Sequence, residues 1–144
     1  MVSQDLQQSN RLRACRRTFL PSLIALAASG LITPLPAAPA GLAGSWSGGG
    51  WVAFSNGKKE KARCHARYSR QSETSYTLSA TCATASGKAS QTATLHRVGA
   101  NSYSGGFQNS DYNISGSIYV VVHGNSQSVR LSGGGASASL SLSR

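Results

Sequence analysis

Residues 136–143 read Ala-Ser-Ala-Ser-Leu-Ser-Leu-Ser, a strict alternation of apolar residues with serine. Successive side chains of a β-strand point to opposite faces, so this stretch predicts a strand with one buried face and one solvated face. The stretch 112–122 follows the same rule, and its apolar and glycine positions share one face: Tyr112, Ile114, Gly116, Ile118, Val120 and Val122. No stretch after residue 40 has helical periodicity, which predicts an all-β fold.

Turn signals divide the chain after residue 40 into eight expected strands. Gly, Asn, Ser or Asp occupies nearly every junction, and the short links favour antiparallel neighbours in a meander. An eight-strand meander can close as an up-and-down barrel or stack as a two-layer sandwich, and we favour the barrel because it leaves no free edges. The expected strands are 45–54, 60–69, 75–84, 88–98, 102–108, 112–123, 126–132 and 135–143.

Cys64 and Cys82 are the two cysteines that follow residue 40. An even cysteine count in an exported chain indicates a disulfide. Centring the second hairpin on Glu73 sets the two cysteines opposite each other, where Cα atoms lie about 4.5–5.5 Å apart and a disulfide can form. Spacing and count therefore both predict a Cys64–Cys82 bond.

The turn chemistry also sets the registers of the other hairpins. A two-residue turn at Gly124-Asn125 puts Val120 opposite Val129, which pairs apolar with apolar. A turn at Gly133-Gly134 puts Leu131 opposite Ala136. The same reasoning gives the hairpin that precedes these two along the chain a four-residue loop.

That loop, residues 108–111, sets Phe107 opposite Tyr112. The first hairpin has two readings, since a plain two-residue turn buries Trp51, whereas a bulge at Gly57 buries its neighbour Val52. We favour the bulge because it also buries Phe54 and gives the more apolar set.

Many residues on the expected inner face are small. Such residues either leave a cavity or let the strands approach closely, and both outcomes stay open. They are Gly48, Gly50, Ala62, Ala66, Ala80, Ala93, Gly105, Gly116, Ala136 and Ala138.

Residues 1–40 have the features of a cleaved signal peptide. Four arginines precede the apolar run 19–32, and the small-residue sequence Ala38-Pro39-Ala40 follows it. Arg16-Arg17-Thr18-Phe19-Leu20 resembles the twin-arginine export motif, with an ordinary Sec leader as the alternative. We expect cleavage after Ala40, which leaves residues 41–144 as a single domain with a formal charge of +7. The expected location is the periplasm or the outside of a bacterial cell, without an integral membrane anchor.

A row of cations alternates with inward residues between residues 59 and 67. The row consists of Lys59, Lys61, Arg63, His65 and Arg67, at about 6.6 Å intervals. We call it the basic stripe. It could bind anionic lipid, acidic polysaccharide or another polyanion, or it could be a solvated face that protects an edge strand. Tyr68 falls on the opposite face, so no specific nucleic-acid motif is present.

The sequence offers little for catalysis. Residues 41–144 hold three acidic residues, Glu60, Glu73 and Asp111, without close pairing, and no nucleophile elbow or phosphate loop. The three histidines, His65, His96 and His123, lack metal-ligand spacing. We therefore expect no catalytic residue, metal or cofactor. The larger aromatic residues are expected in the core or at its rim rather than as a ligand platform: Trp46, Trp51, Phe54, Tyr103, Phe107 and Tyr112.

Several short motifs carry resemblances. Gly44-Ser45-Trp46-Ser47-Gly48-Gly49-Gly50, followed by Arg63-Cys64, Tyr68 and Cys82, resembles a group of small exported bacterial proteins of uncharacterised function. The opening Gly44-Ser45-Trp46 is also similar to that of lipocalins and avidins, although the later tryptophans of the avidin biotin pocket have no counterpart. Small periplasmic barrels that inhibit metalloproteases likewise begin with Gly-x-Trp and hold one disulfide.

These features predict a non-enzymatic, exported binding module for an anionic or amphiphilic ligand. A protease inhibitor on a small barrel and a structural envelope or matrix protein are the alternatives. The ligand and the oligomeric state are left open by the sequence.

Overall fold

The computed structural model describes Thr33 and residues 41–144. The expected leader, apart from Thr33, and its cleavage site after Ala40 lie outside the described residues. In the part that is described, no helix is long and apolar enough to cross a membrane.

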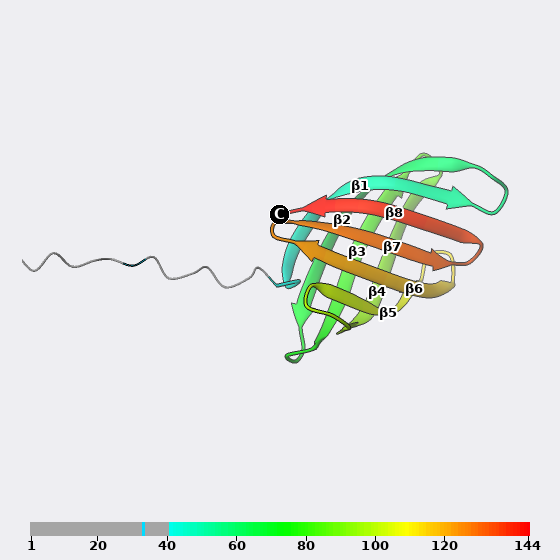
Figure 1. Ribbon diagram of the computed structural model, residues 1–144. Coiled ribbons are helices and arrows are strands. Elements are labelled where there is room, and N and C mark those ends of the chain that lie inside the picture. The colour runs from blue at the N-terminus through cyan, green and yellow to red at the C-terminus, as the bar shows by residue number, and fades with distance from the viewer. Residues whose placement is uncertain (1–32, 34–40) are drawn as a thin grey trace, which may run out of the picture. The chain divides into compact units, whose positions relative to one another are not determined.

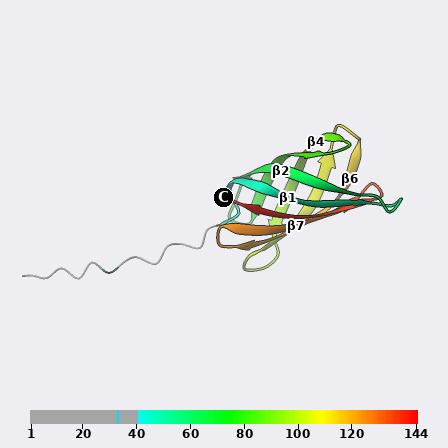
Figure 2. The same ribbon diagram turned by 90° about the horizontal axis from the view of Figure 1, so that it is seen from above.

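Eight antiparallel strands form a closed up-and-down barrel, as predicted (Figures 1 and 2). Each strand pairs with the next one along the chain, and the last pairs with the first. The strands are β1 (Gly44–Phe54), β2 (Lys59–Arg70), β3 (Ser75–Thr84), β4 (Gly87–Arg97), β5 (Ser102–Asn109), β6 (Ile114–His123), β7 (Ser126–Gly133) and β8 (Ala136–Ser143).

The predicted disulfide is present. Cys64 and Cys82 lie directly opposite each other on β2 and β3, with Cα atoms 4.1 Å apart. The first hairpin has the predicted bulge, since Gly57 adopts a φ of +84° and the Phe54 N–H donates to the Lys58 carbonyl. Val52 therefore points inward.

Two predicted registers are wrong, that of β7 with β8 by two residues and that of β5 with β6 by four. Leu131 pairs with Ala138, not Ala136, because the turn glycines are Gly134 and Gly135. Both have positive φ, +59° and +73°, a conformation that favours glycine over residues with a side chain. A shift of two keeps every side chain on its predicted face.

The loop between β5 and β6 also lies further along the chain than predicted. Phe107 pairs with Gly116, not Tyr112, and Asn109 pairs with Ile114. The Asn109 carboxamide oxygen accepts a hydrogen bond from the Tyr112 N–H at 3.1 Å, which stabilises a turn at this point. Tyr112 is consequently a turn residue.

The small inner residues have both of the consequences that the sequence left open. The inner glycines allow close backbone approach, since a Cβ built on Gly50 would lie 2.0 Å from the Ser139 carbonyl oxygen. Ala136 and Ala138 instead line a cavity of the barrel. The glycines thus let neighbouring strands approach closely, and these alanines leave space in the interior.

Candidate functional site

One end of the barrel interior is filled with large side chains. We call it the packed end; it carries the β2–β3, β4–β5 and β6–β7 turns. Trp46 is 1% exposed, and its indole N–H donates to the Leu42 carbonyl at 2.9 Å. The Arg144 guanidinium lies 4.3 Å from the Trp46 ring centroid, and the rings of Tyr76 and Tyr103 meet edge to face. Large enclosed side chains therefore occupy the interior at this end.

Two polar side chains are also enclosed there. Tyr68 is 2% exposed, and burial raises the pKa of its phenol well above its ordinary value. Gln127 is 2% exposed, and its carboxamide has no hydrogen-bond partner among the described residues. These groups lie within the core, so they offer no open site.

The opposite end contains a cavity of about 310 Å³. We call this end the mouth; it carries the β1–β2, β3–β4, β5–β6 and β7–β8 turns. Apolar side chains make up much of the wall, and they include Val52, Phe54, Cys82, Ala89, Phe107, Ile114, Leu131, Ala136 and Ala138. The volume is at the lower end of the range for small-molecule sites.

A few polar side chains interrupt the apolar wall of the mouth. Gln91 on β4 and Asn109 on β5 place carboxamides in it, while Phe107 on β5 adds apolar surface beside them. None of the lining side chains carries a formal charge. The cavity therefore suits a neutral, mainly apolar molecule with a polar group.

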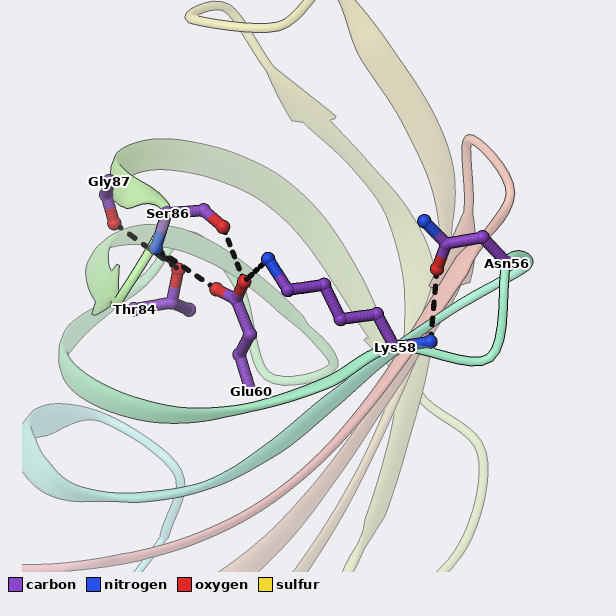
Figure 3. A network of polar contacts seen from close by, with 6 residues as sticks. All are labelled: Asn56, Lys58, Glu60, Thr84, Ser86 and Gly87. Carbon is purple, nitrogen blue, oxygen red and sulfur yellow. Dashed lines mark hydrogen bonds and ion pairs between the residues drawn. The ribbon is translucent and has the colours of Figure 1, made fainter.

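Beside the mouth, a polar network ties two turns together (Figure 3). Glu60 is only 5% exposed; it forms an ion pair with Lys58 at 2.7 Å and accepts hydrogen bonds from the backbone N–H and hydroxyl of Ser86. Hydrogen bonding from Lys58, then from Ser86 and Thr84, lowers the pKa of Glu60 to about 2. The ionised carboxylate thus holds the β1–β2 and β3–β4 turns together.

The basic stripe lies on the outer face, as predicted. All five side chains are exposed, and β2 is paired on both sides, with β1 and with β3. Protection of an edge strand therefore does not explain these charges. The stripe is separate from the mouth, because none of its five residues lines the cavity. These residues are Lys59, Lys61, Arg63, His65 and Arg67.

The histidines are exposed, as the alternation predicts. The His65 ring nitrogen Nδ1 lies 3.0 Å from the Ser47 hydroxyl, at hydrogen-bond distance. Within residues 41–144, no three His, Cys, Asp or Glu side chains gather in a way that could hold a metal ion.

The expected places of the aromatic residues need one correction. Trp46, Tyr103 and Phe107 are buried, and Phe54 and Tyr112 line the mouth. Trp51 belongs to neither group, since it is 50% exposed on the outer face. Its position follows from the bulge in the first hairpin, which turns the neighbouring Val52 inward.

The sequence did not single out the polar residues of the mouth. Gln91 and Asn109 occupy inward positions of β4 and β5, where alternation predicts apolar side chains. Their polarity at inward positions could have identified them from the sequence, because an inward polar residue either hydrogen-bonds to a neighbouring group or faces a cavity.

No protein-family model matches this chain, and no curated protein matches it. Solved designed barrels share its fold. The redesigned β-barrel mFAP1, solved bound to DFHBI, has a TM-score of 0.61 at 12% identity, over 72% of this chain and 94% of that one. A de novo designed fluorescence-activating β-barrel has a TM-score of 0.56 at 17% identity, over 71% of this chain and 92% of that one. At these identities the likeness establishes the fold alone.

Proposed function

We propose that this chain is an exported, non-enzymatic binding protein that takes up a small, neutral amphiphile in the mouth of its barrel. The cavity of about 310 Å³ is the observation that carries the proposal. Its walls combine apolar side chains with the carboxamides of Gln91 and Asn109. An apolar cavity with a few polar groups is the usual form of a small-molecule site.

The packed end supports the same proposal. Large side chains fill the barrel there, whereas at the mouth Ala89, Ala136 and Ala138 stand at lining positions where larger apolar residues would reduce the cavity. Unfilled space forfeits packing contacts, so a cavity retained at one end has a cost in stability that ligand binding can offset. The designed barrel mFAP1, which was solved with a small molecule, supports the capacity of this fold to bind one.

The proposal is tested with N-phenyl-1-naphthylamine, a neutral dye whose emission rises on leaving water. We expect a saturable rise with the unaltered protein. Ala138→Leu fills the cavity with an inward side chain on β8 and should weaken dye binding by about tenfold or more.

Ala83→Leu is the matched control. Ala83 lies on β3 between the cavity-lining residues Cys82 and Thr84, but it is exposed and does not line the cavity. We expect this variant to bind the dye as the unaltered protein does. Absence of saturable binding, or equal binding by Ala138→Leu, would refute the proposal.

A further inference from the structure

A line of side chains on the outer face crosses five neighbouring strands. The ladder pairs Tyr119 with Arg130, Arg130 with Ser139, Ser139 with Trp51, and Trp51 with Lys61. We call these five residues the outer row. Adjacent strands lie about 4.8 Å apart, so the row extends roughly 19 Å across β6, β7, β8, β1 and β2. The first four of these strands lie side by side in Figure 1.

The two aromatic residues of the row are unusually exposed. Trp51 is 50% exposed and Tyr119 is 42% exposed. The Lys61 ammonium lies 5.5 Å from the Trp51 ring centroid, a cation–π contact that helps to hold both side chains in place. The row therefore offers two exposed aromatic rings and two cations to a ligand that lies across the strands.

Serines dominate the two lines that flank the outer row on β6, β7, β8 and β1. The line towards the mouth consists of Ser117, Ser132, Ser137 and Ala53. The line towards the packed end consists of Val121, Ser128, Ser141 and Gly49. On β2 the two lines end at Lys59 and Arg63, on either side of Lys61. Over four of its five strands, the row therefore rises above a floor made mainly of serine hydroxyls and backbone.

The electrostatics of this surface favour an anion. The acidic residues of the described chain lie elsewhere: Glu60 is buried and paired with Lys58, Glu73 lies in the β2–β3 turn, and Asp111 accepts a hydrogen bond from the Ser90 N–H. Within residues 41–144, no carboxylate therefore forms an ion pair with Lys61 or Arg130. Both cations are exposed and available to a ligand.

We propose that the outer row binds an acidic polysaccharide that lies across the strands. The Trp51 and Tyr119 rings would stack on the apolar faces of sugar rings, and Lys61 and Arg130 would pair with acidic substituents. Serines of the flanking lines supply donors and acceptors that match sugar hydroxyls. This site lies outside the barrel and is independent of the amphiphile site in the mouth.

Intrinsic tryptophan fluorescence provides a direct titration. Trp46 is 1% exposed, so a change in emission on adding polygalacturonate fragments reports on Trp51. We expect saturable binding of polygalacturonate and none of pullulan, a neutral polysaccharide. Affinity electrophoresis measures the same binding in variants that lack Trp51.

Charge-matched variants separate the outer row from the other cations of β2. Lys61→Gln/Arg130→Gln removes both cations of the row and should weaken binding about tenfold. Arg67→Gln/Arg70→Gln removes the same charge from exposed positions on β2 away from the row, and should weaken binding less than about threefold. Equal losses in the two variants would show diffuse attraction by the cations of β2 and overturn the proposal.

The aromatic contribution has its own test. Trp51→Ala/Tyr119→Ala leaves the net charge unchanged and should weaken polygalacturonate binding about tenfold. Unchanged affinity in this variant would overturn the proposal. Tighter, row-dependent binding of a single-stranded oligothymidylate, or of vesicles containing phosphatidylglycerol, would also overturn it by assigning the surface to another class of ligand.

Discussion

At the packed end the interior is filled by Trp46, Tyr103 and Leu95, whereas at the mouth Ala136 and Ala138 leave a cavity of about 310 Å³. Both ends are built from the same alternating strands, so the difference comes from side-chain size and not from backbone pattern. Large side chains at one end supply stability through burial, and small ones at the other leave room for a ligand. Under the proposed function, stability and binding therefore depend on opposite ends of one barrel.

The largest expected effect is at the packed end. Trp46→Ala removes a fully enclosed side chain, its hydrogen bond to Leu42 and its contact with Arg144, and should lower the free energy of unfolding by about 4 kcal/mol. Denaturant unfolding measures the change. Trp51→Ala, on the exposed outer face, should change it by less than about 0.5 kcal/mol. Similar losses in the two variants would contradict the packing difference.

The disulfide joins the two regions, because Cys64 belongs to the core and Cys82 lines the mouth. Replacing both cysteines with alanine should lower the free energy of unfolding by about 3 kcal/mol, since the bond closes a loop with a sequence separation of 18 residues. Thermal unfolding of this variant beside the oxidised protein measures the effect. A loss below about 1 kcal/mol would mean that chain entropy is not the main contribution.

An identical substitution at the two ends sharpens the contrast. Ala66→Leu adds volume next to Trp46 in the core, where Ala66 is 6% exposed, and should destabilise the protein by about 2 kcal/mol. Ala138→Leu enters the cavity and should cost less than about 0.5 kcal/mol. If Ala138→Leu were as destabilising as Ala66→Leu in denaturant unfolding, the mouth would be as tightly packed as the other end.

The smallest expected effect concerns acid stability at the mouth. The pKa of Glu60 is lowered to about 2 in the folded protein from an ordinary value of 4.5. Its carboxylate therefore contributes stability that is present above about pH 4.5 and is lost as the pH falls towards 2. Glu60→Gln should flatten the fall in melting temperature over this range. Glu73→Gln, an exposed turn variant of equal charge, is the matched control.

Alternation along the strands was sufficient to predict which face most side chains take. Combined with the positions of the turns, it placed Cys64 opposite Cys82 and Val120 opposite Val129, and both pairs are observed. It could not select the turn glycines, since any adjacent pair within Gly133–Gly135 can adopt positive φ. A shift of two residues preserves the faces, so the sequence pattern contains no signal against it.

The cavity and the outer row depend on closure of the barrel. Whether Ala138 faces a cavity depends on the side chains that reach it from strands distant in sequence, such as Phe107 on β5. The alignment of Trp51 with Arg130 requires β1 to pair with β8 in one register. Neither relation follows from the hairpins, which are all that turn chemistry specifies.

The central claim is that a neutral amphiphile binds inside the mouth and not at the packed end. Methyl-resolved NMR during a titration with N-phenyl-1-naphthylamine tests it most directly, because both ends carry suitable methyl groups. We predict saturable shifts at Val52, Ile114 and Leu131, with little change at Leu95, Val120 and Leu142. Shifts confined to the packed end or to outer-face residues, or no saturable shift at all, would contradict the account.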